Sequence, residues 1–333
     1  MHKKRLFHIP LALLSALLLV LTSACSASTD DGSGTRANAG ASASTQLQTV
    51  KIGAVPTLIL GFLQVGEQQG YFAKQGLKLD ITPADSGPNI ISSLAAGQYD
   101  LAYTAYAPAL VAVAGGQDLR LVDHLDNVSA AGHNAGLLVK SDSPITRWKD
   151  LEGKKIGANA PRSQLVLWIQ AAIKADGGDP STLQIVPLPL NQIADNVAQG
   201  KLDAGSVTEP YLTQAHSSPA LRDLGDPATA GFSQGTPSGG VFTSEKTLQA
   251  KSDVITKYRA AFAQTIDYAN GHVDEVRAQG AKLVGLSDAA AKTITIDPIS
   301  TDVKAEDFGP FVKALTELGW TKTDVDIERF LSR

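Results

Sequence analysis

Hydroxyl side chains, glycine and a few charged or aromatic groups recur where predicted strands give way to predicted helices. Helix N-termini present backbone N–H groups and a positive dipole end there, which favour a negatively charged group. Glycine at such a position lets the backbone approach a bound molecule closely. The sequence thus predicts a set of ten ligand-contacting residues: Thr57, Ser86, Gly87, Thr104, Tyr106, Arg162, Ser163, Asn191, Glu209 and Tyr211.

Most of these residues also have a structural interpretation. Thr57 and Ser163 are typical helix N-caps whether or not they touch a ligand. Arg162 would be unfavourable at a helix start unless an anion faced it. Glu209 could meet a cationic group or hold a turn, and the two tyrosines of the set fit a core as well as a cleft. Trp168, on an apolar helix face, is expected in the core.

Catalytic and metal-binding patterns are missing from the sequence. It contains no nucleophile elbow, no zinc-binding His-x-x-x-His helix and no phosphate-binding P-loop. The single cysteine excludes a disulfide framework and a cysteine-based zinc site, and six histidines leave few general bases. We therefore expect no metal, no cofactor and no enzymatic activity, because the candidate residues suit recognition better than catalysis.

The composition is that of a folded protein larger than one typical core. The chain has 333 residues, of which 43% are hydrophobic and 19% charged, which excludes wholesale disorder and suggests two domains. The formal net charge is −4, and residues 1–24 hold three basic and no acidic side chains. The remainder is more acidic still, so a nucleic-acid partner is not expected.

The N-terminus has the pattern of an export signal. Lys3, Lys4 and Arg5 precede the apolar run Ile9–Leu21, which is shorter than the roughly 20 residues of a membrane span. Leu21-Thr22-Ser23-Ala24-Cys25 resembles the lipobox of bacterial lipoproteins, with Thr22 where leucine is usual. We expect a signal peptide at 1–24, a lipidated Cys25 and a flexible tether over 25–48. The alternative is an ordinary cleaved signal with Cys25 as a bystander.

Two phrases occur twice in the rest of the chain. Lys-Ile-Gly-Ala begins at Lys51 and at Lys155, 104 positions apart, and a second phrase repeats with Asp100 and Asp203, 103 positions apart. Two matches at nearly one offset predict two similarly built lobes. Asp100 and Asp203, directly before strands, are expected to accept hydrogen bonds from turn amides.

Each lobe alternates strands and helices, which predicts parallel α/β sheets. The expected strands are 49–54, 78–82, 101–103, 155–158, 184–188 and 204–207, and the expected helices 58–69, 89–96, 107–114, 163–175 and 192–199. Segment 136–140 leaves the first lobe, strand 239–243 returns to it, and helices follow from residue 252. The expected ranges are 49–138 for the first part of lobe 1, 139–238 for lobe 2 and 239–333 for the return to lobe 1 and the C-terminal helices. Two crossovers would act as hinges around a cleft, and His133 and Asn134 are further candidates there.

Several phrases resemble the substrate-binding lipoproteins of ABC importers, in particular those for nitrate, alkylsulfonates, taurine and thiamine-type pyrimidines. They are Lys51-Ile-Gly-Ala54, Gly70-Tyr-Phe72, Leu94-Ala-Ala-Gly-Gln-Tyr-Asp100, Ala114-Gly-Gly116, Trp148-Lys-Asp-Leu-Glu-Gly-Lys-Lys-Ile-Gly157, Gly200-Lys-Leu-Asp-Ala204 and Glu209-Pro210. The resemblance implies a type II periplasmic-binding-protein fold, a permease with its ATPase as partners, and a monomer. It also implies a place on the extracytoplasmic face of the cell membrane, or in the periplasm.

The expected ligand is a small organic anion such as a sulfonate, captured by closure of the lobes. One alternative is a thiamine-type pyrimidine stacked on Tyr106 or Tyr211 and hydrogen-bonded to Glu209. A weaker alternative, which the resemblance also implies, is an exported enzyme of the same fold.

Overall fold

The computed structural model describes residues 46–129, 135–297 and 299–332. The predicted signal peptide, Cys25, most of the tether, His133 and Asn134 lie outside the described residues. Within the described ranges, every helix is too short or too polar to cross a bilayer.

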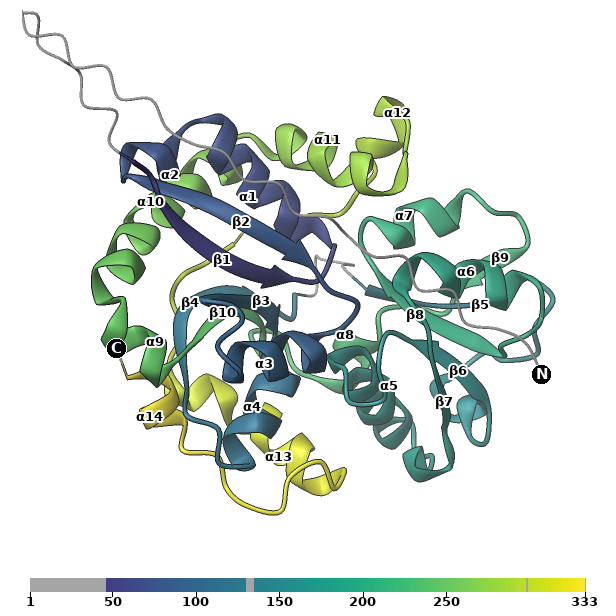
Figure 1. The fold of residues 1–333 in the computed structure, drawn as a ribbon. Coiled ribbons are helices and arrows are strands. Elements are labelled where there is room, and N and C mark those ends of the chain that lie inside the picture. The colour runs from purple at the N-terminus through teal and green to yellow at the C-terminus, as the bar shows by residue number, and fades with distance from the viewer. Residues whose placement is uncertain (1–45, 130–134, 298, 333) are drawn as a thin grey trace, which may run out of the picture. The chain divides into compact units, whose positions relative to one another are not determined.

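Two five-stranded sheets form the two lobes (Figure 1), which confirms the predicted α/β fold of two lobes. The first has the order β2 (Leu77–Pro83), β1 (Gln48–Ala54), β3 (Leu101–Ala105), β10 (Pro237–Ser244) and β4 (Leu119–Asn127). The second has the order β7 (Gln184–Pro187), β6 (Lys155–Ala158), β8 (Ala204–Thr208), β5 (Ala135–Lys140) and β9 (Leu221–Asp223). In both, the three strands of the repeated unit stand in the order second, first, third, and a crossover strand follows. The sequence repeat thus corresponds to two sheets with the same strand order.

The sheets are mixed rather than parallel throughout, so this part of the prediction was wrong. β10 runs antiparallel to β3 and β4, and β5 runs antiparallel to β8 and β9. Helical crossovers make strands parallel, whereas β5 and β10 enter their sheets directly from the other lobe. Because β5 and β10 belong wholly to the sheets they enter, the crossovers precede Ala135 and Pro237. They are earlier than the predicted boundaries after residues 138 and 238.

β4 was not predicted, because its charged residues hide a strand that is largely buried. Arg120, Asp123, His124 and Asp126 interrupt its apolar residues. Arg120 pairs with Glu245 at 3.0 Å. A buried charge normally needs a partner. The pair with Glu245 therefore stabilises β4 against the segment that follows β10.

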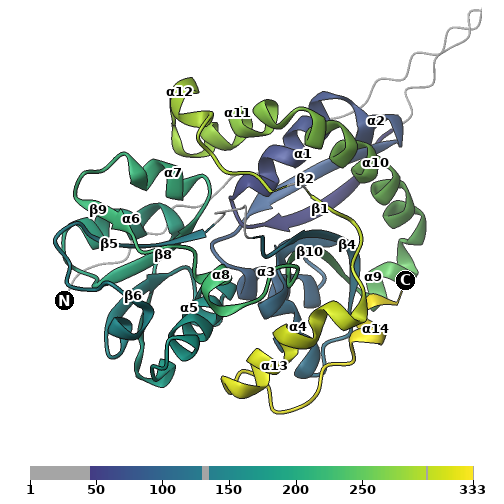
Figure 2. The same ribbon diagram turned by 180° about the vertical axis from the view of Figure 1, so that it is seen from behind.

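Helices cover both sheets. Those of the first lobe are α1 (Leu58–Gln68), α2 (Tyr71–Lys74), α3 (Gly87–Ala95), α4 (Tyr106–Ala114), α9 (Glu245–Ala250), α10 (Ser252–Gly271), α11 (Val273–Val284), α12 (Asp288–Ala291), α13 (Gly309–Glu317) and α14 (Ile327–Leu331). Those of the second are α5 (Gln164–Ala175), α6 (Leu190–Ala198), α7 (Tyr211–His216) and α8 (Pro227–Gly231), and short 3-10 helices lie at Trp148–Leu151, Pro180–Thr182 and Ala305–Phe308. α11 and α12 lie at one end of the first lobe, and α13 and α14 lie at the other (Figure 2). At Gly66 an added Cβ would lie 2.3 Å from Thr265 Oγ1, so glycine lets α1 and α10 pack closely.

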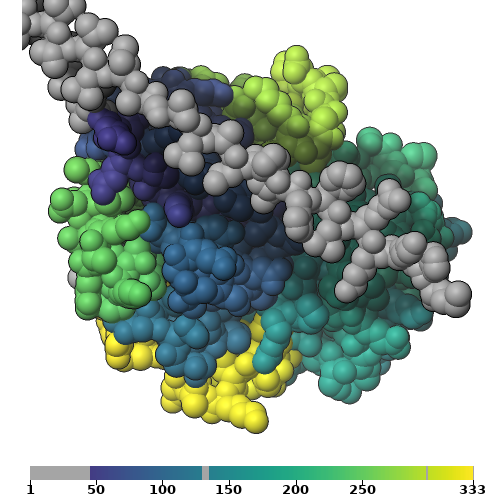
Figure 3. Space-filling model, in the orientation of Figure 1, coloured from purple at the N-terminus to yellow at the C-terminus, as the bar shows by residue number. Residues whose placement is uncertain are grey.

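α5 connects the second lobe to the first. The Gln164 side chain accepts a hydrogen bond from the Ala107 N–H at 3.0 Å and donates one to the Ser238 carbonyl at 2.8 Å. Farther along α5, Lys174 pairs with Glu317 of α13 at 2.7 Å. Figure 3 shows the result as a yellow C-terminal surface that adjoins the teal surface of the second lobe.

Candidate ligand-binding cleft

A cavity of about 220 Å³ lies between the lobes, at the carboxyl ends of the strands. Residues at the start of α1, α3, α5 and α6 line it. Ligands of open α/β sheets bind at this edge, and helix N-termini there leave backbone N–H groups without partners inside the helix. The cavity can hold a small organic molecule.

Five of the predicted residues are brought together in this lining: Thr57, Gly87, Thr104, Ser163 and Glu209. Gly87 is needed for the assembly, because an added Cβ would lie 2.4 Å from Thr104 Oγ1 and 2.8 Å from Pro108 Cγ. The glycine thereby lets the start of α3 approach β3 and α4. Whether these residues touch a ligand stays a prediction.

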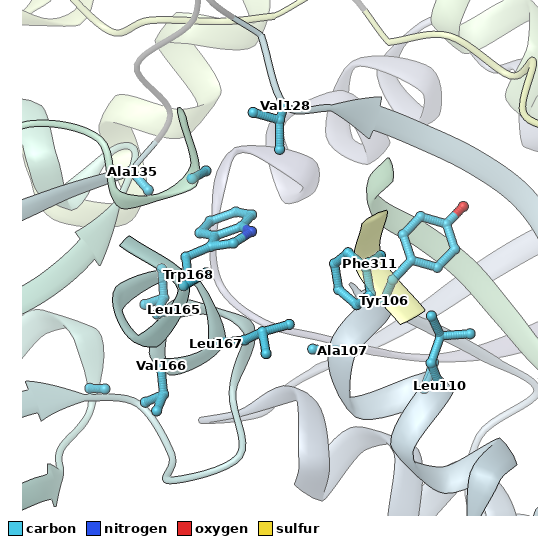
Figure 4. Close-up of a cluster of buried hydrophobic side chains, with 14 of the residues drawn as sticks. Tyr106, Ala107, Leu110, Val128, Ala135, Leu165, Val166, Leu167, Trp168 and Phe311 are labelled. Atoms are coloured by element: carbon cyan, nitrogen blue, oxygen red, sulfur yellow. The ribbon is translucent and has the colours of Figure 1, made fainter. Parts of the chain in front are cut away.

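The other five, Ser86, Tyr106, Arg162, Asn191 and Tyr211, lie outside the lining. Tyr106 is buried in the core, where its hydroxyl hydrogen-bonds His124 Nδ1 at 2.9 Å and its ring packs edge-on against Phe242 and Phe308. Figure 4 shows Tyr106 and Trp168 at opposite sides of the drawn cluster. The ring of the first residue of α4 thus points into the core.

Arg162 faces the C-terminal segment of the first lobe. Its Nη2 donates a hydrogen bond to the Trp320 carbonyl at 3.3 Å, and the guanidinium lies 5.1 Å from the Trp320 ring centre. A cation–π contact of this kind stabilises a partly exposed guanidinium. Arg162, which the sequence suggested as a partner of an anionic ligand, therefore contacts Trp320 of the first lobe and lies outside the cavity lining.

Five lining side chains have a buried polar atom with no hydrogen-bond partner in the described protein: Tyr103 Oη, Asn159 Oδ1, Ser163 Oγ, Trp168 Nε1 and Thr208 Oγ1. Tyr103, Ser163 and Trp168 are 1%, 4% and 7% exposed. Leaving a buried donor or acceptor unsatisfied costs about 1–3 kcal/mol. Their gathering around one cavity indicates groups that bind water or solute.

Trp168 was expected in the core, and it is both buried and part of the lining. In Figure 4 its indole projects from α5 toward Val128 and Ala135, two further lining residues. An apolar helical stripe does not distinguish a core tryptophan from one that borders a cavity. Its position did offer a signal that it borders the cavity, because Trp168 lies one helical turn after Gln164 on a helix that begins at the cleft.

The described lining contains four carboxylates, Asp126, Glu209, Asp226 and Asp297, and no lysine, arginine or histidine. Glu209 accepts hydrogen bonds from the Thr213 N–H at 3.0 Å, from Thr213 Oγ1 at 2.9 Å and from the Thr295 N–H at 3.3 Å. Burial raises its pKa, and these bonds oppose the rise. Asp226 accepts from the Ala228 N–H at 2.7 Å and caps α8. Both carboxylates of the second lobe thus hold backbone in place.

Asp126 and Asp297 come from the first lobe, and the charge of Asp297 acts on Asp126. Burial raises the pKa of Asp126 to about 6; hydrogen bonds from Ser238 and the Gly239 N–H lower it, and the charge of Asp297 adds to the rise. Burial also raises the pKa of Asp297, against a hydrogen bond from Ser129. An added Cβ on Gly239 would lie 2.5 Å from Asp126 Oδ1, so the carboxylate rests on the backbone of β10. Sequence reasoning missed both residues, although an aspartate among the apolar residues of Leu119–Asn127 was a signal for Asp126.

Two α/β lobes of equivalent strand order, two crossovers and a cavity between the lobes define the periplasmic-binding-protein fold. Solved structures agree. The alkanesulfonate-binding protein SsuA from Xanthomonas axonopodis pv. citri, bound to MOPS, superposes with a TM-score of 0.74 at 18% identity, over 86% of this chain and 98% of that one. The nitrate-binding protein NrtA from Synechocystis PCC 6803 gives 0.67 at 12% identity, over 85% and 84%.

Residues 60–276 match the family model described as NMT1/THI5 like, and the chain belongs to this family. A Bacillus subtilis (strain 168) protein named for binding aliphatic sulfonates is 27% identical over 252 residues, 73% of this chain and 71% of that protein. The bicarbonate-binding protein CmpA of Synechococcus elongatus is 25% identical over 189 residues, 50% of this chain and 42% of that protein. Family membership, fold and relatives thus agree: the chain has the fold of the periplasmic binding proteins and is similar to proteins named for binding sulfonates and bicarbonate.

Proposed function

We propose that the protein captures a small organic solute with an oxyanion head, such as a sulfonate, between its lobes and delivers it unchanged to a permease driven by an ATPase. The observation that carries this proposal is the convergence of the N-termini of α1, α3 and α5 on one cavity. Each of these helices has nine or more residues. Their first-turn N–H groups and dipoles favour a negative group.

Neighbouring side chains support an oxyanion head. Ser163 Oγ and Trp168 Nε1 can both donate hydrogen bonds and have no partner in the described protein. Phe62, Leu165 and Ile296 give the same cavity apolar walls for an organic body. Relatives are named for sulfonates, bicarbonate and nitrate, which are all oxyanions.

Calorimetry with alkyl and aromatic sulfonates tests this proposal. We expect binding with a 1:1 stoichiometry, and a roughly tenfold weaker affinity for Ser163→Ala, because a hydrogen bond to a charged group contributes about 1.5–3 kcal/mol. The exposed Ser181→Ala is the matched control and should bind as the parent does. Tight binding of a neutral heterocycle, with no heat from any sulfonate, would contradict the proposal.

A thiamine-type pyrimidine is the second candidate, favoured by the indole of Trp168 in the lining. Tyr106 and Tyr211 lie outside the lining, so the pyrimidine ring would stack on Trp168. Glu209 already accepts three hydrogen bonds. A pyrimidine bound through Glu209 should be lost in Glu209→Gln, whereas sulfonate affinity should change little in that variant.

We also propose binding without chemical conversion, a monomeric state, and export with lipid anchoring at Cys25 on the extracytoplasmic face. The relatives are named as binding proteins, and two solved neighbours are named as periplasmic. Mass spectrometry should recover each bound solute unchanged. Labelling of cells with a radioactive fatty acid should mark the parent protein and leave Cys25→Ser unmarked; equal labelling of both would refute the anchor.

A further inference from the structure

We infer that the C-terminal residues 305–331 form a strap that restricts the movement of the two lobes relative to each other. This strap comprises the 3-10 helix Ala305–Phe308, α13 and α14. Both of its ends are fixed to the first lobe, whereas its middle contacts the second lobe. The inference goes beyond the proposed function and holds for any solute that the cavity binds.

The two ends of the strap are anchored in the core of the first lobe. The rings of Phe308 and Phe330 pack edge-on against the ring of Tyr106, with ring centres 4.9 and 6.2 Å from it. Phe330 also packs against Phe242 of β10, with ring centres 5.8 Å apart. Aromatic pairs at such separations attract each other in addition to the area that they bury. α13, which lies between these two phenylalanines, is therefore held at both ends by one lobe.

Polar contacts add to the second anchor. Thr323 Oγ1 donates a hydrogen bond to the Ala114 carbonyl, at the end of α4, at 2.8 Å. Arg329 of α14 pairs with Asp118, directly before β4, at 2.8 Å. The chain that follows α13 thus returns to the first lobe and is fastened there.

Two polar contacts join the middle of the strap to α5 of the second lobe. Trp320 Nε1 donates a hydrogen bond to Gln170 Oε1 at 2.7 Å. Glu317, the last residue of α13, pairs with Lys174 at 2.7 Å. Gln170 and Lys174 are four positions apart, so they lie on one face of α5. The strap therefore contacts α5 along that face.

Ring contacts reinforce this junction between strap and second lobe. The ring of Phe311, in α13, stacks on that of Phe232, directly after α8, with centres 5.7 Å apart. The guanidinium of Arg162, just before α5, lies over the Trp320 ring. Trp320 is 5% exposed and Phe232 is 9% exposed, so these rings are packed between the lobes. In Figure 3 the yellow surface of the strap adjoins the teal surface of the second lobe.

The strap lies away from the cavity. Gln164 and Trp168, one helical turn apart on α5, line the cavity, whereas Gln170 does not. Gln170 follows Trp168 by two positions, which corresponds to about 200° around a helix. The strap and the cavity thus lie on opposite faces of α5, and the strap can restrict the lobes without touching a solute.

Contacts of this kind narrow the range of lobe positions. A hydrogen bond weakens steeply as its geometry departs from the optimum, and packed atoms lose their attraction within about 1 Å of added separation. Rotation of the second lobe about its two crossovers, in either direction, displaces α5 from α13 and weakens the junction. The strap thus favours the lobe separation of this structure, and breaking its junction should widen the range of separations.

Distances between spin labels on the two lobes, measured by pulsed EPR on the ligand-free protein, test the inference. The parent for these measurements carries Cys25→Ser, because Cys25 is the only cysteine of the chain. One label pair is Asp195→Cys with Lys257→Cys, and the other is Asp142→Cys with Lys78→Cys. All four labelled positions are exposed, and each pair places one label on each lobe. With two pairs, a rotation that leaves one distance unchanged is detected by the other.

Two double variants break the same two polar contacts from opposite sides. Gln170→Ala with Lys174→Ala removes the partners on α5. Trp320→Phe with Glu317→Ala removes the partners on the strap and keeps an apolar ring in the packed position. Each double variant should widen the distance distribution of at least one label pair by about 1.5-fold or more. Circular dichroism and thermal melting confirm that each variant is folded.

Lys313→Ala with Thr316→Ala is the matched control. Both residues are exposed on α13, and the ion pair of Lys313 and the hydrogen bond of Thr316 stay within that helix. The control should keep the distribution widths of the parent. Unchanged widths in either strap variant, or equal widening in the control, overturn the inference. Because no solute is present, failure of every sulfonate to bind would refute the proposed function and leave this test of the strap unaffected.

Discussion

The two lobes share one strand order but present different chemistry to the cleft. The first contributes Asp126 and Asp297, whose charges interact. The second contributes Ser163 and Trp168, whose polar atoms have no partner in the described protein. The carboxylates of the second lobe are held in backbone hydrogen bonds. Asp126 and Asp297 are called the acidic wall below, and Ser163 and Trp168 the wall of neutral donors. Each lobe contributes two carboxylates to the described lining, and the first lobe also contributes the hydroxyl of Tyr103, which has no partner in the described protein.

The opposite edge of the sheets shows no such difference. Asp100 accepts a hydrogen bond from the Lys51 N–H of β1 at 3.1 Å, and Asp203 accepts one from the Lys155 N–H of β6 at 2.8 Å. The predicted bonds to turn amides were therefore wrong in their donor, because both aspartates bond to a neighbouring strand instead. Equivalent positions at the amino ends of the strands thus make the same bond in both lobes. The comparison teaches that the repeat is kept where residues hold the fold, and that it differs where residues line the cavity.

Trp168 should give the largest effect on the wall of neutral donors. Trp168→Ala should lower the free energy of unfolding by about 3 kcal/mol, since it removes a large buried side chain, and should abolish measurable solute binding. Denaturant unfolding and calorimetry check these results. Trp168→Phe, which keeps an apolar ring and removes the N–H donor, should recover most of the stability but not the affinity. Parental affinity in Trp168→Phe would show that the indole N–H is not used.

Asp126, in the acidic wall, should make the free energy of unfolding depend on pH. Asp126, with its pKa raised to about 6, keeps its proton in the folded protein where the unfolded chain has lost it. Its favourable contribution is therefore complete below about pH 4 and is lost as the pH rises through about 6. Asp126→Asn removes this loss, so its stability relative to the parent should grow over that interval by up to about 3 kcal/mol. Urea unfolding at several pH values measures the difference, and a difference independent of pH would contradict the prediction.

Asp100 and Asp203 test the similarity of the two lobes at the amino ends of the strands. Asp100→Ala and Asp203→Ala should each lower the free energy of unfolding by about 1–2 kcal/mol through loss of the hydrogen bond to the neighbouring strand, with no change in solute affinity. Asp100→Ala should be the more damaging, because Asp100 also pairs with Lys251 at 2.7 Å. Urea unfolding and calorimetry of both variants check this, and a loss of affinity in either would show that the two edges are coupled.

Arg162 should give the smallest effect. Arg162→Gln removes the contact with Trp320 but no group of the cavity lining. We expect a loss of stability below about 1 kcal/mol and a change in sulfonate affinity below about twofold. Calorimetry and denaturant unfolding measure both. A tenfold loss of sulfonate affinity would show that Arg162 contributes to ligand binding.

Most repeated elements could be predicted because their periodicity and glycine stops are local signals. The predicted strand 155–158 and helix 163–175 correspond to β6 and α5 within one residue. β4 could not be predicted, because its charges are acceptable only with partners from distant segments, such as Glu245 for Arg120. Half of the predicted site residues line the cavity. The position of a loop in the chain places Thr57 and Ser163 at the cleft. It does not indicate whether the ring of Tyr106 points into the cleft or into the core, because that depends on distant partners such as His124.

By itself the sequence determined the duplicated α/β plan and the strand ends where a ligand would bind, since both follow from local pattern and from the repeat of Lys51–Ala54 at Lys155–Ala158. Only the tertiary structure decided that Asp126 and Asp297 line one cavity, where the charge of Asp297 acts on Asp126, that Trp168 borders the cavity and that Arg162 does not. The physical reason is that the charge of a cleft depends on which side chains converge from segments far apart in the chain. No local pattern records that convergence.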